Sequence, residues 1–340
     1  MVTQRSSAAD DEPVTLKDIA REAGVAVSTV SRALNMPDRV NARTRDRVLA
    51  VATALDYRPG SPPTSRGTSA VGLFVPDVRN PFYSEILAGL GAQLSAAGYL
   101  QFLIDTEESF ERENEYLSRI QHVSDGVVMV ASRSSNDELR RLAERIPLVT
   151  INRPITEIPG VVVDDTLGIT EAVEHLVALG HTHICYVAGP ATAWADRHRR
   201  VAASEATQRL RVKLDIIGPM RPTRAAGVAA ADAVAHSGAT ACIAYNDLLA
   251  IGMITRFASR GISVPGEVSV VGCDDIFGAD FCDPPLTTIG GDLRAVGSEA
   301  GKKLIALMKP GLFDASKEIA AVPAQLLVRG STGSAHHTAR

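Results

Sequence analysis

Polar side chains suited to binding a small hydroxylated molecule follow several short apolar runs of this sequence. Asn80, Asn246 and Asp274 each stand within a few residues of the end of such a run. Amides and carboxylates hydrogen-bond the vicinal hydroxyl groups of a sugar, and an aromatic ring supplies an apolar face. Taken singly, the two asparagines are interpreted equally well as helix caps. The candidate rings are Phe82, Phe281 and the single tryptophan, Trp194, which we expect in a loop.

A second group of polar side chains, near the N-terminus, has chemistry suited to duplex DNA. Ser28, Thr29 and Arg32 lie on one face of an expected short helix that follows Gly24. Arginine pairs bidentately with guanine, and hydroxyl groups reach phosphates or bases. A compact three-helix cap with the same exposed residue types is the competing interpretation.

Side chains arranged for catalysis or for metal binding are not expected. The sequence has no glycine-rich nucleotide loop after its first strand, no G-x-S-x-G and no histidine-paired nucleophile. His181 and His183 are predicted to point to opposite sides of a turn. The four cysteines are dispersed without a C-x-x-C pair, which predicts buried thiols rather than a zinc site or disulfides. We therefore expect no enzyme, no metal and no cofactor.

Composition indicates a multidomain globular protein. The 340 residues are 45% apolar and 22% charged, and the net charge is −4. Between 14 and 60, however, eight basic side chains oppose five acidic ones, which favours contact with phosphates. Neither a signal peptide nor an apolar run of the roughly 18 residues needed to span a membrane is visible. We expect a cytoplasmic protein.

Apolar spacing predicts three helices in the first 60 residues. The first carries an apolar stripe from Leu16 to Ala23 with a capping-box-like start at Thr15, and Gly24 ends it. The second begins near Val27, and the third covers 42–55. This order places the second helix in a major groove. Gly60 to Ser69, with two adjacent prolines, reads as a linker.

Beyond residue 70, short β-branched runs alternate with helical patterns, which predicts an α/β fold with parallel sheets and helices on both faces. Three of the helices end at Gly98, Gly180 and Gly261, where a left-handed residue returns the chain to the sheet. The alternation occurs in two series, so we expect two lobes with a cleft between them. The predicted strands are 71–75, 100–104, 127–130, 148–151, 161–163, 184–188, 241–244 and 268–271. The predicted helices are 82–97, 110–121, 137–145, 166–179, 198–210, 223–236 and 247–260.

The run from 14 to 59 closely resembles the DNA-binding headpiece of the lac-repressor (LacI/GalR) family of transcription regulators. The resemblance extends to about residue 332 through VPDVRNPF at 75–82, EHLVALGH at 174–181, ND at 246–247, VVGCDD at 270–275 and PPLTTI at 284–289. It implies a helix-turn-helix domain at 14–60, a hinge at 61–69 and a periplasmic-binding-protein-like core at 70–332. Lobe 1 would comprise about 70–162 and 291–320, and lobe 2 about 163–290 and 321–332.

The resemblance assigns DNA contacts residue by residue. It implies that Val27, Ser28 and Arg32 face bases. It places a further set at or near the DNA backbone, namely Thr15, Thr29, Asn35, Thr44 and Tyr57. The chain departs from the family pattern at Gly60-Ser-Pro-Pro63, where a hinge helix with a minor-groove leucine is usual. Because prolines oppose a regular helix, we expect weaker operator bending than is usual in the family.

The resemblance also implies effector contacts and a mechanism. The contacts fall on Asn80, Phe82, Asn246, Asp274 and either Arg197 or Arg199, because Ala202 replaces the glycine that would fix the register; we add Trp194 to this set. The implied partners are double-stranded operator DNA, a small carbohydrate effector and a second copy of the chain, without a membrane. Effector and operator affinity would then be linked, and the resemblance implies a repressor. A periplasmic-type sugar-binding protein and a sugar-metabolising enzyme are the alternatives.

Overall fold

The structure, a computed structural model, describes residues 16–35, 39–55, 68–309 and 318–335. The chain divides into two compact units, Met1–Ser69 and Ala70–Arg340, which we call the headpiece and the core. Three expected sites fall outside the described residues: Thr15, Tyr57 and the proline-containing linker at 61–67. The side chain of Asn35 is likewise not described. Among the described residues, no helix is both long and apolar enough to cross a membrane.

The headpiece contains the three predicted helices, α1 (Leu16–Ala23), α2 (Val27–Asn35) and α3 (Ala42–Ala54). Their apolar faces meet in one small core, in which Ile19, Val30 and Val48 are fully buried. Gly24 has a φ of +62°, a conformation that costs glycine little, and it separates α1 from α2 as predicted. The spacing of the apolar residues thus leaves one face of α2 free.

The core is built on one series of eleven strands in the order β2-β1-β3-β4-β5-β11-β10-β9-β8-β6-β7. All neighbouring strands are parallel except β10 and β11, which are antiparallel. The strands are β1 (Ala70–Val75), β2 (Leu100–Asp105), β3 (Gly126–Val130), β4 (Leu148–Ile151), β5 (Gly160–Asp164), β6 (His183–Val187), β7 (Lys213–Ile217), β8 (Ala241–Ala244), β9 (Ser269–Cys273), β10 (Thr287–Gly291) and β11 (Ile319–Leu327).

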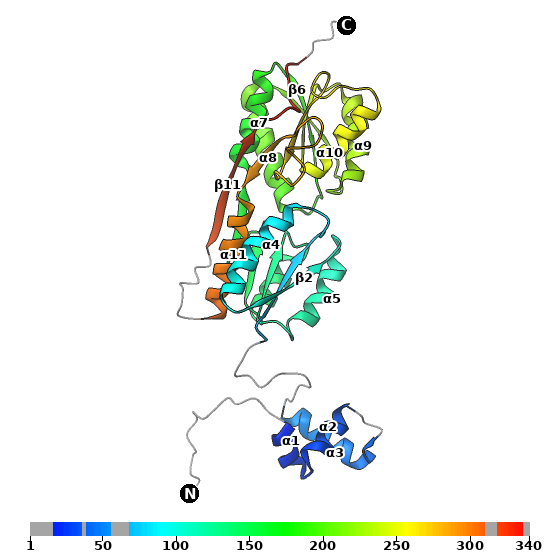
Figure 1. Ribbon diagram of the computed structural model, residues 1–340, viewed down its shortest axis with the longest axis vertical. Helices are drawn as coiled ribbons and strands as arrows, with labels where there is room; N and C mark the ends of the chain where they lie inside the picture. Colours follow the sequence, from blue (N-terminus) through cyan, green and yellow to red (C-terminus); the bar gives the residue numbers. More distant parts are fainter. Residues whose placement is uncertain (1–15, 36–38, 56–67, 310–317, 336–340) are drawn as a thin grey trace. The chain divides into compact units, whose positions relative to one another are not determined.

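The strands and helices of the core form two lobes (Figure 1). Lobe 1 contains β1 to β5 with α4 (Phe82–Ala96), α5 (Phe110–Ile120), α6 (Asn136–Ala143) and α11 (Leu293–Met308). Lobe 2 contains β6 to β10 with α7 (Thr166–Ala178), α8 (Trp194–Leu210), α9 (Arg224–Ser237) and α10 (Asp247–Ser259). The predicted α/β architecture is confirmed.

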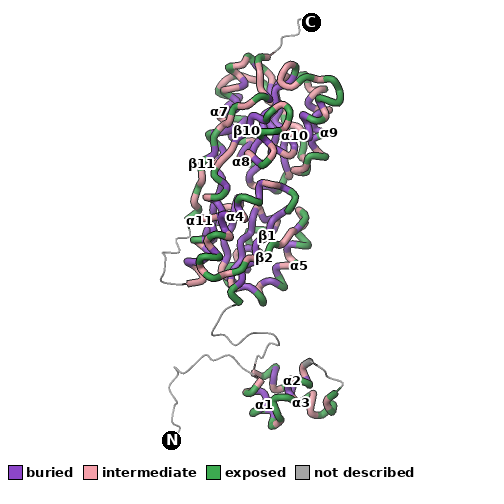
Figure 2. Tube along the Cα trace, in the orientation of Figure 1, coloured by how far each residue is buried: buried purple, intermediate pink, exposed green. Residues whose placement is uncertain are grey.

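Helices cover both faces of each half-sheet. In lobe 1, α4 and α11 pack on one face, whereas α5 and α6 pack on the other. In lobe 2, α7 and α8 take one face, and α9 and α10 the other. Strands β1, β3, β4, β8 and β9 are buried on both sides (Figure 2), which explains why they appear in the sequence as continuous apolar runs, whereas β2, β7 and β11 are largely exposed or half-buried.

Strand β11 joins the lobes. Its first half pairs with β5 up to Pro323, and its second half pairs with β10 from Ala324. Because β10 is antiparallel to β11, the strands of lobe 2 run opposite to those of lobe 1. The carboxyl ends of both sets of strands therefore face each other across the junction between the lobes.

Glycines set the closest helix contacts of each lobe. A Cβ on Gly297 would lie 2.0 Å from the carbonyl oxygen of Ile86, and one on Gly89 would lie 2.0 Å from that of Arg294. The α9–α10 pair of lobe 2 repeats the arrangement with Gly227 and Gly252. At these crossings the helix backbones touch directly, so no larger residue fits without displacement.

Several elements differ from the sequence expectations. Strands β7, β10 and β11 and helix α11 were not predicted. Trp194 was expected in a loop and is instead the first residue of α8, which begins four residues earlier than predicted. The three helix-ending glycines do adopt positive φ values, +84°, +91° and +72°, as predicted.

Candidate functional site

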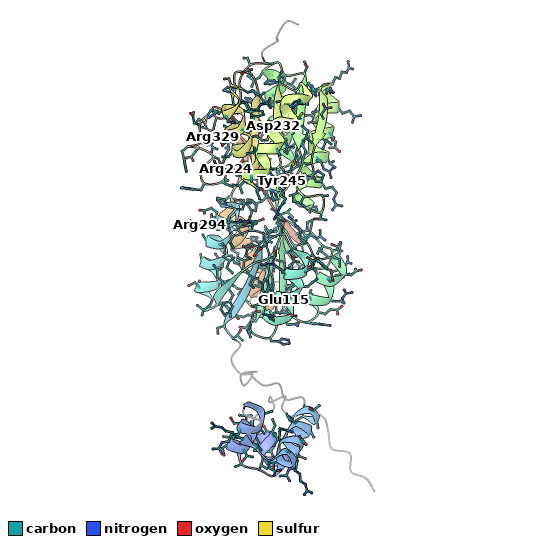
Figure 3. The ribbon with its side chains drawn as sticks, turned by 90° about the vertical axis from the view of Figure 1, so that its right-hand side faces the viewer. Glu115, Arg224, Asp232, Tyr245, Arg294 and Arg329 are labelled. Carbon is teal, nitrogen blue, oxygen red and sulfur yellow. The ribbon has the colours of Figure 1, made fainter. Side chains whose placement is uncertain are left out.

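A pocket lies where the carboxyl ends of the two half-sheets meet. Its walls come from both lobes, and Tyr245 marks its position between them (Figure 3). The pocket is lined by Asn80, Phe82, Tyr83, Glu108, Ala131, Arg133, Asn152, Ala193, Trp194, Ala195, Arg199, Pro222, Tyr245, Asn246 and Asp274. Its free volume is only about 30 Å³, far below the several hundred Å³ of usual ligand pockets. A sugar-sized molecule therefore enters only if lobes or side chains move.

Three asparagines that line this pocket use their side-chain oxygens to accept hydrogen bonds from backbone amides, and the Nδ2 of Asn246 donates to the Pro222 carbonyl at 3.4 Å. The Oδ1 of Asn80 accepts from the Phe82 amide at 3.1 Å, that of Asn152 from Val163 at 2.8 Å, and that of Asn246 from Leu249 at 3.0 Å. Asn80 and Asn246 are thus both backbone caps and pocket residues. The capping interpretation is confirmed for Asn246, whose side chain caps α10, whereas contact of either asparagine with a ligand stays a prediction.

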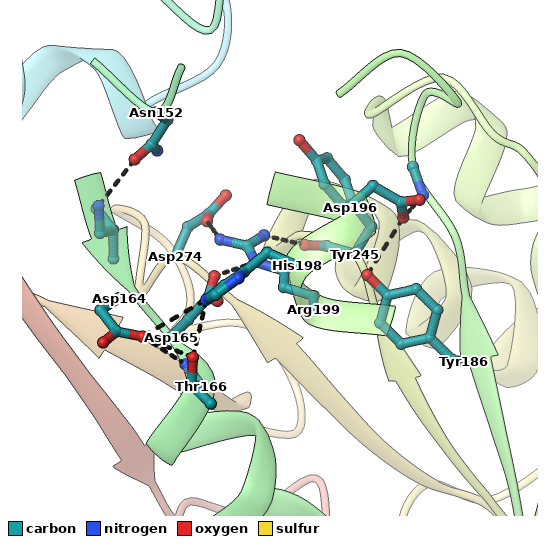
Figure 4. A network of polar contacts seen from close by, with 12 residues as sticks. Asn152, Asp164, Asp165, Thr166, Tyr186, Asp196, His198, Arg199, Tyr245 and Asp274 are labelled. Carbon is teal, nitrogen blue, oxygen red and sulfur yellow. Dashed lines mark hydrogen bonds and ion pairs between the residues drawn. The ribbon is translucent and has the colours of Figure 1, made fainter. Parts of the chain in front are cut away.

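Arg199 organises the polar floor of the pocket (Figure 4). Its guanidinium donates to Asp165, to the carbonyl of Tyr245 and, at 3.0 Å, to Oδ1 of Asp274. Arg199 and Asp165 are almost fully buried. Burial opposes the charge of Arg199, but the adjacent carboxylates outweigh it and raise the pKa of this guanidinium well above its usual range. The arginine stays charged and ties α8 to two loops.

Asp274 is one of two acidic side chains that line the pocket, together with Glu108. Burial raises the pKa of Asp274 to about 6, although the hydrogen bond and positive charge of Arg199 act in the opposite direction. Its φ is +113°, which is uncommon for an aspartate. A carboxylate held in this way accepts hydrogen bonds from a ligand above its pKa and donates one below it.

Backbone strain gathers around the same pocket. Glu108, Ala131, Asn152 and Asp274 all line it with φ between +45° and +113°, and each follows the end of a different strand. Such conformations cost about 1–3 kcal/mol each and persist where surrounding contacts enforce them. Such a concentration of positive φ values is typical of a functional site.

Aromatic rings form the apolar walls. Phe82 meets Tyr83 edge-to-face at 5.2 Å between centroids, and Trp194 stacks on His198 at 4.8 Å. Phe281 was considered as a third ring, and the structure corrects this. It is 64% exposed and contacts Phe277 on the surface instead of lining the pocket.

The two arginine alternatives separate clearly. Arg199 lines the pocket, whereas Arg197 is exposed and is not among the lining residues. The spacing of the small residues of α8 could have indicated Arg199 in advance. Ala195, Ala202 and Ala206 are buried on the same face of the helix as position 199. Asn80, Phe82, Trp194, Asn246 and Asp274 all reach the pocket, as expected.

Sequence reasoning missed the contribution of the lobe 1 loops after β2, β3 and β4. Glu108, Arg133 and Asn152 follow β2, β3 and β4 directly. Their position in the sequence could have indicated them, because ligands in open parallel sheets bind beyond the carboxyl ends of the strands. From the sequence, we considered only the loops after β1, β8 and β9. A wider cavity of about 620 Å³ lies beside the pocket and shares Glu108, Arg133 and Pro222 with it.

The headpiece residues assigned to DNA lie on the surface where they are described. Val27, Ser28 and Arg32 are exposed at α2, and Val27 has 41% of its surface accessible. Thr29 and Thr44 are half-buried. This face of α2 is opposite Val30 and Ala33, which are buried in the helical core.

A separate polar cluster in lobe 2 combines three metal-ligating residue types. His183, Cys185 and Asp215 have their ligand atoms within 4.8 Å of one another. The His183 ring nitrogen lies 2.7 Å from Asp215 Oδ2, and the ammonium of Lys213 lies 3.0 Å from the same oxygen. The carboxylate is thus already paired with a cation of the chain, and we assign no metal there.

Comparison with known proteins agrees with these two units. The family described as bacterial regulatory proteins, lacI family, matches residues 15–60, and a periplasmic binding protein-like domain matches 173–332. The transcriptional regulator DegA of Bacillus subtilis is 30% identical over 331 residues, covering 94% of this chain and 98% of its own length. This chain belongs to the lacI family. The transcriptional repressor CytR of Escherichia coli K12 is 31% identical over 332 residues, covering 94% of this chain and 96% of its own.

Solved structures of the same family share the architecture. A complex of the transcriptional regulator CelR with cellobiose superimposes with a TM-score of 0.71 at 26% identity, covering 94% of this chain and 99% of that one. The lac repressor dimer bound to operator and the anti-inducer ONPF gives a TM-score of 0.71 at 25% identity, covering 95% and 100%. The protein is a DNA-binding transcriptional regulator whose core has the fold of a ligand-binding domain.

Proposed function

We propose that this protein represses transcription by binding an operator through α2 and that a small hydroxylated ligand in the interlobe pocket controls this binding. The observation that carries the proposal is the pocket itself: amides, a carboxylate and an arginine from both lobes converge between aromatic rings. The cellobiose and ribose complexes of related regulators support a carbohydrate. Because operators lie in the cytoplasm, the proposal places the protein there and assigns it no reaction.

On the DNA side, we propose that Val27, Ser28 and Arg32 read base edges. Thr15, Thr29, Asn35, Thr44 and Tyr57 would contact the backbone. The exposed position of Arg32 on α2 supports the first part, because its guanidinium is free to approach a guanine edge. Val27 and Ser28 are small, so Arg32 would carry much of the direct readout.

On the ligand side, we propose that Asn80, Asn246, Arg199 and Asp274 bind the hydroxyl groups while Phe82 and Trp194 cover the ring faces. Arg199 would connect a bound ligand to the junction between the lobes. It contacts both Asp274 in the pocket and Asp165, the residue that follows β5. A ligand that changes the hydrogen bond between Arg199 and Asp274 would therefore also affect the contact of Arg199 with Asp165, where the chain crosses between the lobes. Operator affinity and ligand affinity are then reciprocally linked.

We further propose that the protein acts as a homodimer, since two half-sites of an operator need two headpieces. Two exposed apolar surfaces support this. Edge strand β2 exposes Leu100 by 70% and Phe102 by 46%, and Phe277 and Phe281 meet edge-to-face on the surface of lobe 2. Unpaired apolar edge strands are unusual in monomers, and a second copy would cover them.

The experiment selects preferred sequences from a random duplex pool with the purified full-length chain. The affinity for the best duplex is then measured by fluorescence anisotropy with and without cellobiose, ribose and a panel of further sugars and nucleosides. We expect a two-half-site sequence and at least one compound that changes the affinity tenfold or more. Absence of any sequence preference contradicts the DNA part, and an unresponsive protein contradicts the ligand part.

A further inference from the structure

The wall of the pocket in lobe 1 contains an ion pair that no family motif of the sequence indicated. The Nε of Arg133 donates to Glu108 Oε2 at 2.9 Å, and its Nη2 contacts the same oxygen. Only 9% of the Arg133 side chain and 16% of the Glu108 side chain are exposed. The pair lines both the inner pocket and the wider cavity beside it, so a ligand in the pocket lies against it.

Each partner of this pair stands on a strained loop. Glu107 and Glu108 have φ values of +51° and +59°, and Ala131, two residues before Arg133, has +45°. The Nη1 of Arg133 donates back to the Ala131 carbonyl at 3.1 Å. Two consecutive left-handed residues other than glycine need external contacts to remain in place.

Glu113 provides stabilising contacts for the second of these loops, at 132–134, which carries Arg133. Its carboxylate, on α5, is 2% exposed and accepts hydrogen bonds only from this loop among the contacts of the described residues. The donors are the hydroxyls of Ser132 and Ser134 and the amides of Arg133 and Ser134, the two amides both at 3.1 Å. A buried carboxylate with four donors holds its partners in one geometry.

Glu113 also lies on the helix that follows Glu108. Helix α5 begins at Phe110 and is capped by Ser109, so the loop that carries Glu108 leads directly into the helix whose Glu113 carboxylate holds the Arg133 amide. A second contact fixes the far side of the loop, where Arg153 donates to the Ser134 carbonyl at 2.9 Å. The contacts of Glu113 and Arg153 thus hold the loop that carries Arg133 in place at the pocket wall.

We propose that the Glu108–Arg133 pair is a specificity-determining contact to the effector and that Glu113 is the residue that positions it. The inference rests on the proposed ligand control. The pair offers guanidinium N–H donors beside the second oxygen of a carboxylate, an arrangement that fits two adjacent hydroxyl groups on the part of the ligand that faces lobe 1. Asp274 and Arg199 bind the part that faces lobe 2.

The test compares Glu113→Gln, Arg133→Ala and the double variant with wild type, using the full-length chain. The control is Glu115→Gln, which alters an exposed carboxylate on the same helix that pairs with Arg119. The probe is the compound of the sugar and nucleoside panel with the largest effect on operator affinity. Its dissociation constant is measured by calorimetry, and operator affinity without the compound is measured in parallel.

We expect Glu113→Gln to weaken binding of the compound about tenfold and Arg133→Ala to weaken it at least as much. Because Glu113 acts through Arg133, the double variant binds no more weakly than Arg133→Ala alone, within about twofold. Operator affinity without the compound stays within about twofold of wild type. Hydrogen exchange at the amides of Arg133 and Ser134 becomes faster in Glu113→Gln without ligand and does not change in Glu115→Gln.

Additive losses in the double variant, or unchanged exchange at these two amides, overturn the positioning role of Glu113. Wild-type affinity in Arg133→Ala overturns the specificity role of the pair. Both results are distinct from failure of ligand control itself, in which wild type responds to no compound of the panel. That last result removes the specificity role together with the proposed function.

Discussion

Arg199 and Asp274 are joined by a hydrogen bond of 3.0 Å between Nη2 and Oδ1, and the same guanidinium also contacts Asp165. Asp274 follows β9 in lobe 2, whereas Asp165 stands where the chain passes from β5 into α7. One buried cation therefore connects the polar floor of the pocket to a crossing between the lobes. Breaking one side of this connection leaves a buried charge without its partner, which is costly.

The first prediction concerns ligand response. Asp274→Ala removes the acceptor on the pocket floor, so the variant should bind the selected operator with near wild-type affinity but lose its response to the effective compound. Asp275→Ala is the matched control, because Asp275 pairs with Arg329 and does not line the pocket. Anisotropy with and without compound measures both. Normal response in Asp274→Ala would refute the assignment.

The second prediction concerns pH. Because the pKa of Asp274 is raised to about 6 from 3.8, its protonated form favours the fold below about pH 4, and this stabilisation is lost as pH rises through 6. Relative to Asp274→Asn, wild type should lose on the order of 3 kcal/mol of unfolding free energy between pH 4 and pH 7. Urea unfolding across this range measures the difference. Exposed Asp280→Asn is the control, and a constant difference for Asp274→Asn contradicts the raised pKa.

The third prediction concerns base readout. Arg32→Ala should weaken binding to the selected operator by about 1–3 kcal/mol and relax one base position. Arg32→Lys keeps the charge but not the bidentate geometry, so it should retain the salt dependence of binding and still lose discrimination at that position. This discrimination is measured as the affinities of wild type and both variants for operators that carry each of the four bases at each position. An unchanged base profile in both variants argues against a base contact.

The fourth prediction concerns the α4–α11 crossing. A Cβ at position 297 would meet the Ile86 carbonyl at 2.0 Å, so Gly297→Ala should destabilise the core by at least about 1–3 kcal/mol. Gly91→Ala, on α4, meets only the Gln101 side chain at 3.3 Å or more and should be neutral or stabilising. Calorimetric unfolding compares the two. Equal midpoints would show that the helices separate freely.

The fifth prediction concerns self-association. Phe102→Asp places a charge on the exposed edge strand β2 and should shift the protein from dimer to monomer in sedimentation experiments. Operator affinity should fall strongly because the two headpieces are no longer linked. Val123→Asp changes an exposed apolar residue outside β2 and serves as control. A Phe102→Asp protein that remains dimeric excludes this surface.

Local patterns predicted most of the fold because each signal is short-ranged. The stripe of Ile19 and Ala23, the alternating strands and the helix-ending glycines depend on neighbours in the chain, and all are present. Strand β11 was missed because it contains Pro323 and prolines are rare in central strands. It lies there because the strand changes partners at that point, a tertiary property that no local pattern contains.

The site was predictable in part for the same reason. Asn80, Asn246 and Asp274 follow recognisable strands, so their convergence could be inferred from topology. Arg133 could not be chosen over other loop arginines, because its place depends on Glu113, twenty residues away in sequence. The raised pKa of Asp274 likewise depends on burial by segments that are distant in the chain.

The partner change of β11 also restricts how the core can open. The lobes share three chain crossings, after Asp164, after Gly291 and at Pro323–Ala324, and the last lies within a continuous strand. Sliding one lobe past the other would break the ladders that β11 makes with β5 and β10. A twist of a few backbone dihedrals at the crossings leaves these ladders intact. We therefore expect the core to open by rotation about an axis near β11, and even a modest rotation would move the far end of lobe 1 by a large distance.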